Sequence, residues 1–314
     1  MGSGSWTRES FGTYSAQRAR NVADDGSLKG NWTAQEMYTS TNLDPMLNPK
    51  NVIRECRDSD EHPNTIPVIL ALDVTGSMGD TAVRVATKLN VVMTKLYEQI
   101  KDVEFMIIGI GDFGYDKVPL QVSQFESDIR IAEQLDKLYF EGLGGGNGFE
   151  SYTAAWYFGA RHTSLDCWKR GKKGIIITMG DEQLNPYIPL RGRRVTFAGV
   201  TGDTIEADIE TKDLYEEAKE KFDIYHLNVC HKPNGDGGFR TKDPQIAPSF
   251  KKYLDDTHYR EVTVTSIADE IVDIVLKSSA TSATSWISIP TNISTNTPTE
   301  NSSGVVKTEE GISW

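Results

Sequence analysis

Between residues 66 and 279 the chain alternates between continuous apolar runs and segments whose apolar residues recur at helical spacing. An uninterrupted apolar run is typical of a strand that is buried on both faces of a sheet. Apolar residues three and four positions apart indicate an amphipathic helix. The predicted strands are 66–74, 102–113, 119–126, 172–182, 223–230 and 260–265. The predicted helices are 80–100, 127–138, 150–165, 211–222, 248–257 and 266–279.

This alternation of strands and helices predicts an α/β fold. We expect a Rossmann-like, doubly wound and mostly parallel sheet with helices on both faces. The segment 119–126 is shorter and more polar than the other strands and is expected to be an edge strand. The segment 193–200 fits neither pattern clearly.

The two ends of the chain differ from this central region. Residues 1–64 are polar and are predicted to form an N-terminal extension, a partly ordered arm that the apolar patch of Val52, Ile53 and Cys56 could pin to the main domain. Residues 65–279 form the predicted domain. Residues 280–314 are rich in Ser, Thr and Asn, which predicts a low-complexity tail. A Gly-rich insertion at 231–245 receives no role.

Composition narrows the class of partner. The formal net charge is −12 over 314 residues, which argues against binding to nucleic acid or to anionic membranes, because both are negatively charged. No apolar stretch is long enough to span a membrane, and the first residues lack the apolar centre of a signal peptide. The three cysteines stand far apart without a CxxC pair. We therefore expect a soluble cytoplasmic protein with reduced thiols.

Oxygen-bearing side chains gather in three loops that follow predicted strands. The first loop holds Asp73, Thr75 and Ser77. The second, "GLGGGNGFES", holds Asn147, Glu150 and Ser151, and the third, "TMGDEQ", holds Asp181. The carboxyl ends of parallel strands share one edge of the sheet, where ligands bind in such folds. A hard divalent cation prefers oxygen ligands. Glycines at 76, 79 and 144–146 would permit tight turns and close approach of the loops.

These motifs resemble the von Willebrand factor type A (VWA) domain and its metal-ion-dependent adhesion site. Asp73, Thr75 and Ser77 match the family's D-x-S-x-S loop, with Thr in place of the first Ser, and Asp181 matches the third loop. The second loop lacks the common G-G-T. It is similar to the "GGGD-G-P-E" loop of VWA domains linked to α-kinases and to the D-x-P-E of integrin β subunits.

On this match Glu150 is a metal ligand and Asn147 a supporting one, although Phe149 replaces the relatives' Pro and Asn147 their Asp. The resemblance implies a non-enzymatic module that binds Mg²⁺ or Mn²⁺ and takes an Asp or Glu from a partner protein at the open metal position. In integrin β relatives an acid at the position of Asp80 helps bind a second metal. The simpler interpretation of Asp80 is a carboxylate that faces a helix N-terminus.

Other functions fit the motifs less well. The Gly-rich loop fails the G-x-G-x-x-G pattern and is not followed by G-K-[ST], which argues against a nucleotide loop. A haloacid-dehalogenase-type phosphatase needs a second acid where this chain has Thr75. No histidine forms a recognisable triad. The aromatic residues Tyr152, Trp156, Tyr157 and Phe158 are expected to pack in the core, and Tyr152, next to the second loop, could also line the binding face. A metal-dependent hydrolase would need a general base, for which Asp112 or Glu182 are the candidates.

One alternative from a different class stays open. The chain could be a structural or assembly protein of a bacterial or phage complex, or a subunit acting with an AAA+ ATPase, that uses the fold as a scaffold and forms an oligomer or larger assembly.

Overall fold

The computed structural model describes residues 4–141, 146–230, 232–233, 239–240 and 243–284. The expectations for the tail from 285 onwards, for Gly144 and Gly145, and for part of the 231–245 insertion lie outside the described residues.

A six-stranded sheet in the order β14-β11-β7-β2-β3-β4 forms the centre of the fold. Its strands are β2 (Ile66–Asp73), β3 (Val103–Ile110), β4 (Leu120–Val122), β7 (Gly174–Gly180), β11 (Phe222–Val229) and β14 (Tyr259–Val262). All neighbouring pairs are parallel except β3 and β4, which are antiparallel. The predicted doubly wound sheet with one distinct edge strand is therefore confirmed.

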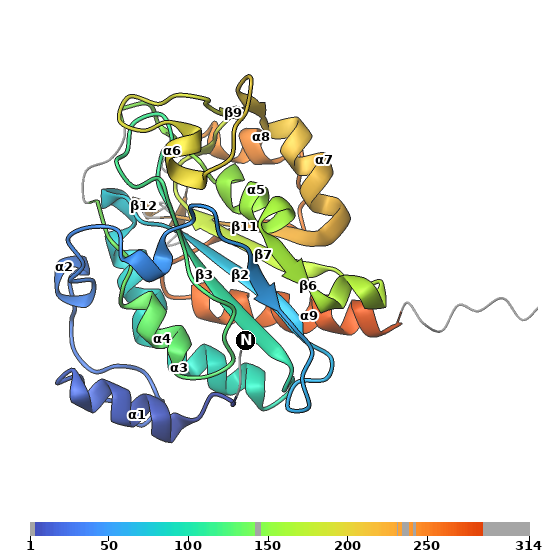
Figure 1. Ribbon diagram of the computed structural model, residues 1–314. Coiled ribbons are helices and arrows are strands. Elements are labelled where there is room, and N and C mark those ends of the chain that lie inside the picture. The colour runs from blue at the N-terminus through green and yellow to red at the C-terminus, as the bar shows by residue number, and fades with distance from the viewer. Residues whose placement is uncertain (1–3, 142–145, 231, 234–238, 241–242, 285–314) are drawn as a thin grey trace, which may run out of the picture.

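Helices cover both faces of the sheet (Figure 1). One face carries α1 (Arg8–Gln17), α3 (Gly79–Tyr97), α4 (Arg130–Leu135) and α9 (Ile267–Thr284). The other carries α5 (Thr153–Arg161), α7 (Thr211–Lys221) and α8 (Ile246–Phe250). Among the described residues, no helix is both long enough and apolar enough to cross a membrane.

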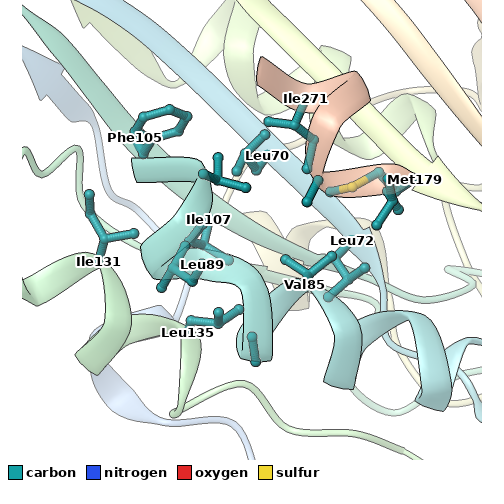
Figure 2. Packing of buried hydrophobic residues seen from close by; sticks show 14 of the residues in the cluster. Leu70, Leu72, Val85, Leu89, Phe105, Ile107, Ile131, Leu135, Met179 and Ile271 are labelled. Atoms are coloured by element: carbon teal, nitrogen blue, oxygen red, sulfur yellow. The ribbon is translucent and has the colours of Figure 1, made fainter. Parts of the chain in front are cut away.

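Alternate residues of each strand pack into two separate hydrophobic cores, one on each face of the sheet. Figure 2 shows Leu70 and Leu72 of β2 packing with Leu89 of α3 and Ile271 of α9 on one face. Ile69 and its alternate neighbours point to the other face, where the aromatic residues of α5 lie. The predicted core cluster of Tyr152, Trp156, Tyr157 and Phe158 is confirmed, because all four are at most 1% exposed. Burial on both faces explains why the strands are uniformly apolar.

The N-terminal segment packs along the first of these faces and around the sheet edge. It contains α1, α2 (Ala34–Met37), a short 3₁₀ turn (Pro45–Leu47) and β1 (Arg54–Cys56). The indole of Trp6 donates to Asn90 Oδ1 of α3 at 2.9 Å. Within the predicted apolar patch, Cys56 is fully buried but Ile53 is 54% exposed, so the patch does not act as a single contact.

The helix predicted for 150–165 is divided in the structure. Residues 149–150 form β5 (Phe149–Glu150), α5 covers only the middle, and the last residues form β6 (Thr163–Leu165). β5 pairs with β8 (Gln183–Leu184), and β6 pairs with β1. Strand partners that are distant in sequence thus replace helical hydrogen bonds at both ends.

Two other predicted helices are shorter than expected. The helix at 127–138 narrows to α4, and its N-cap residue is Ile129 rather than a Ser or Asp. The helix at 248–257 becomes α8, which begins two residues earlier, because Pro248 fits the first turn of a helix. It ends before Asp255, whose carboxylate accepts from the backbone amides of Thr257 and His258 at 2.9 and 3.1 Å and forms a turn instead.

The remaining elements are short and lie outside the central sheet. The ambiguous segment 193–200 turns into α6 (Phe197–Thr201), capped by the Thr196 hydroxyl, which accepts from the Gly199 amide at 3.1 Å. The other short elements are a 3₁₀ turn (Asp166–Arg170) and the strands β9 (Tyr187–Ile188), β10 (Ile209–Glu210), β12 (Lys232–Pro233) and β13 (Phe239–Arg240).

Candidate metal site at the carboxyl edge of the sheet

The first loop leaves β2 at its last residue, Asp73. The Asp73 Oδ1 atom accepts hydrogen bonds from the Thr75 amide at 2.9 Å and from the Thr75 hydroxyl at 2.6 Å. Asp73 and Thr75 are buried, whereas Ser77 is exposed in the 3₁₀ turn Gly76–Met78 that leads into α3. The first two side chains therefore lie inside the protein and the third lies at its surface.

The third loop meets the first. Asp181 follows β7 directly and is 1% exposed, and its Oδ1 accepts from the Ser77 hydroxyl at 2.8 Å. β2 and β7 are parallel neighbours, so their carboxyl ends lie side by side. This contact joins residues that are 104 positions apart in the chain.

Tyr152 connects both loops from above the sheet. Its hydroxyl donates to Asp73 Oδ2 at 3.1 Å and accepts from the Glu182 amide at 3.3 Å. The ring lies against Gly180, where a β-carbon would overlap the Tyr152 hydroxyl. Sequence analysis treated Tyr152 as a core residue. Its only sequence signal for a site role is its place directly after the second loop.

Glu150, the last residue of β5, brings the second loop to the site. It is 3% exposed, and its Oε2 has no hydrogen-bond partner among the described residues. Burial raises the pKa of Glu150 well above its usual range, and the negative charge of Asp73 adds to this shift. Glu150 is therefore a buried carboxylate in a negatively charged environment.

The pKa of Asp73 is also raised, to about 7. Burial is the main cause, and the charge of Asp181 contributes in the same direction, while the hydrogen bonds from Thr75 and Tyr152 oppose it. A cation placed between these carboxylates would reverse the local electrostatics, because it offsets the repulsion of like charges.

Asn147, the residue predicted to support the metal, makes two hydrogen bonds that hold the second loop. Its Nδ2 donates to Asp112 Oδ2 at 2.8 Å, and its Oδ1 accepts from the Phe149 amide at 3.3 Å. The next hydroxyl of the loop, Ser151 Oγ, accepts from the Phe113 amide at 2.9 Å. Ser151 is one of the oxygen-bearing residues noted in this loop, and the structure uses its hydroxyl for a backbone contact. Together these contacts fasten the second loop to the 112–116 turn after β3.

The residues present suit a hard divalent cation. Asp73, Ser77, Asp181 and Glu150 offer carboxylate and hydroxyl oxygens, the donors such ions prefer. Within the described ranges, no three His, Cys, Asp or Glu side chains form a metal cage by themselves, so hydroxyl oxygens would be needed to complete the ligand set. The unpartnered Glu150 Oε2 is the observation that fits a cation most directly. Asp80 is exposed in the first turn of α3.

His226 of β11 lies behind Tyr152 and is fully buried. Its ring stacks on Phe250 at 3.7 Å between centroids, and Nδ1 lies 2.9 Å from the Thr178 hydroxyl. Because that hydroxyl donates to the Tyr225 carbonyl at 3.1 Å, its oxygen can accept a hydrogen bond from the Nδ1–H group of His226. Nε2 has no partner among the described residues. Burial lowers the pKa of His226 well below its usual range.

Acid should therefore destabilise the protein through His226. Above about pH 6.5 the imidazole is neutral in both the folded and the unfolded state, and it contributes no pH dependence. Below that value the unfolded state binds a proton that the folded state refuses, so the free energy of unfolding falls by up to about 1.4 kcal/mol per pH unit until the folded-state pKa is reached. Other groups titrate in the same range, so the observable is the difference between wild type and His226→Leu, followed by urea unfolding. As the pH falls, the free energy of unfolding of wild type should decrease more than that of His226→Leu. A difference between the two that stays constant with pH would contradict the prediction.

Comparisons with known proteins give fold-level likenesses only. No family model matches the sequence, and no curated protein matches it. One similar solved structure is the open conformation of the pilus adhesin SpaC from Lactobacillus rhamnosus GG, with 16% identity and a TM-score of 0.46. The match covers 73% of this chain but 31% of SpaC, so the chain spans about a third of that structure.

Two further structures are similar over most of their own length. The vWF domain of the type V pili tip protein Mfa5 from Porphyromonas gingivalis shares 11% identity, with a TM-score of 0.45 and coverage of 69% of this chain and 96% of that one. An aerotolerance-related membrane protein from Bacteroides fragilis shares 15% identity, with a TM-score of 0.40 and coverage of 68% and 99%. The assignment of a site in this chain rests on its own residues.

Proposed function

We propose that the chain is a non-enzymatic, divalent-metal-dependent protein-binding module of the VWA type. It would ligate an Asp or Glu of a partner protein through Mg²⁺ or Mn²⁺. The observation that carries this proposal is the convergence of buried carboxylates from three loops, with one oxygen of Glu150 lacking a hydrogen-bond partner among the described residues.

The proposed ligand set is Asp73, Thr75, Ser77, Glu150 and Asp181, with Asn147 in a supporting role. Hydrogen bonds from Thr75 and Tyr152 would orient Asp73. A bound Mg²⁺ would supply an electrophilic position for one further oxygen ligand. Ser77 is exposed while the three carboxylates are buried, so a partner group would approach from the Ser77 side.

We also propose a cytoplasmic location, and one observation supports each of these two points, the absence of catalysis and the location. Asp112, a candidate general base, is already engaged, because it accepts from the Gly114 amide at 2.7 Å and from Asn147 at 2.8 Å. Cys56, Cys167 and Cys230 are buried free thiols, which is typical of proteins from reducing compartments.

Isothermal titration with Mg²⁺ and Mn²⁺ tests the site. Wild type should bind one of these ions, and Asp73→Ala and Asp73→Asn should each weaken binding by more than about a hundredfold, since even an outer-shell change costs about 10- to 100-fold. Asp73→Asn keeps the shape of the side chain and removes one negative charge.

Asp223→Asn is the matched control, because Asp223 lies near the opposite, amino end of β11. It should bind the ions as wild type does. Circular dichroism checks that each variant is folded. Undiminished binding in folded Asp73→Asn would reject the site.

A further inference from the structure

An arginine-rich turn lies next to the candidate metal site in a chain that is otherwise strongly acidic. Residues 191–194 read Arg-Gly-Arg-Arg, and all three arginines are exposed, while the net charge of the chain is −12. In the part of the chain that the structure describes, no carboxylate pairs with Arg191 or Arg193. Arg194 pairs with Glu141 at 3.3 Å and remains 57% exposed.

The turn is held firmly against the loops of the site. The Gly192 amide donates to the Val195 carbonyl at 2.9 Å, which closes the turn, and the Arg193 amide donates to the Gly114 carbonyl at 2.8 Å. A β-carbon at Gly192 would overlap the Phe113 carbonyl oxygen, so the backbone of the turn packs directly on that of the 112–116 turn.

The 112–116 turn in turn binds the second loop, through the contacts of Ser151 with Phe113 and of Asn147 with Asp112. The arginines are therefore placed relative to Glu150 by a continuous series of backbone and side-chain hydrogen bonds. The Arg193 guanidinium also lies over the Tyr115 ring, 4.4 Å from its centroid, which limits its freedom.

Two hollows meet at this turn. One, of about 530 Å³, is lined by Asp112, Asn147 and Phe149 on the site side and by Arg191 and Arg193 on the other. The second, of about 600 Å³, continues on the far side of the arginines, with Arg194 and Lys117 in its lining. They form a basic trough that begins beside the strand carrying Glu150.

We infer that this trough binds an acidic segment of the same partner protein whose carboxylate reaches the metal. The inference rests on the proposed function for that first carboxylate and adds a second recognition element. Guanidinium groups bind carboxylates through paired hydrogen bonds, so a segment with several Asp or Glu residues matches the turn. Nucleic acid is the other polyanion that exposed arginines can bind, and the comparison with an oligonucleotide below tests it directly.

Fluorescence anisotropy with a labelled oligoglutamate peptide tests the inference on the full chain. A neutral oligoglutamine peptide and a single-stranded oligonucleotide serve as comparison probes, all in the presence of Mg²⁺. Wild type should bind oligoglutamate in preference to both, and Arg191→Gln/Arg193→Gln should weaken that binding by about tenfold or more. Added salt should weaken binding to wild type more than to this variant.

Lys29→Gln/Lys101→Gln removes the same charge from exposed positions away from the trough and should bind oligoglutamate as wild type does. Equal losses in both double variants, no binding by wild type, or a preference for the oligonucleotide would overturn the inference. Mg²⁺ titration separates the two proposals, because the arginine variant should bind Mg²⁺ normally. If the peptide binds through the arginines but the protein binds no Mg²⁺, the trough would be supported and the metal site rejected.

Discussion

Replacing Gly180 by alanine is expected to destabilise the folded protein by about 3 kcal/mol or more and to weaken Mg²⁺ binding. Gly180 ends β7, and its added β-carbon would overlap the hydroxyl and the ring of Tyr152. That ring is fully buried and cannot turn away without breaking its hydrogen bonds to Asp73 and to the Glu182 amide. The first and third loops would therefore separate. Urea unfolding and Mg²⁺ titration measure the two effects.

Two further variants make this prediction specific to the contact. In a Tyr152→Ala background the clash is gone, so Gly180→Ala should add little to the cost of Tyr152→Ala. Gly12→Ala is the matched control, because a β-carbon at Gly12 of α1 meets nothing within 4 Å. It should be neutral or slightly stabilising, as alanine favours a helix more than glycine does. Additive costs of the Gly180 and Tyr152 changes would show that the two residues do not interact as described.

Replacing Glu150 by glutamine is expected to have opposite effects on stability and on metal binding. In EDTA at neutral pH the variant should be more stable than wild type by about 1–3 kcal/mol. The wild-type carboxyl, whose Oε2 lacks a partner among the described residues, must either stay charged in a buried site or take up a proton on folding, and glutamine needs neither. Mg²⁺ should then stabilise the variant far less than wild type, since one anionic ligand is missing. Thermal unfolding in EDTA and in saturating Mg²⁺ gives both quantities.

Glu104→Gln separates this effect from that of neutralising any buried carboxylate. Glu104 of β3 is 1% exposed and its Oε2 is also unpartnered among the described residues, but it lies towards the amino end of its strand, away from the site. The variant should keep the full stabilisation by Mg²⁺. A Glu150→Gln variant that is less stable in EDTA and still fully stabilised by Mg²⁺ would remove Glu150 from the ligand set.

The largest differences between the predicted and observed elements arise where two distant segments pair. The sequence pattern around 150–165 is helical, and α5 does form there, yet the residues on either side become strands because β8 and β1 offer backbone partners. Periodicity within a window reports which face of a segment is apolar. It carries no information about a partner strand that lies tens of residues away, and so the ends of this helix could not be predicted.

The same reason limits what the sequence says about side chains at the site. The order of the loops, and the placing of Asp73 and Asp181 at one edge, follow from parallel strands whose apolar runs are visible in the sequence. The hydrogen-bond partner of each side chain cannot be predicted from these apolar runs. Asn147 is predicted to support the metal, and only the structure shows that its Nδ2 donates to Asp112 and that its Oδ1 accepts from the Phe149 amide. An asparagine side chain can either ligate a metal or form hydrogen bonds, and the residue type alone does not predict these hydrogen-bond partners.

The sequence by itself determined the α/β class, the mostly parallel sheet with its edge strand, and the three loops that share the carboxyl edge, because these depend on local patterns of apolar and polar residues. Only the tertiary structure decided that the Tyr152 hydroxyl bonds both Asp73, which is 79 positions away, and the Glu182 amide of the third loop. It also decided that the Arg191–Arg194 turn lies beside the site. Such contacts depend on how closely backbones approach, as at Gly180 and Gly192, and this closeness is set by packing between segments that are far apart in the chain.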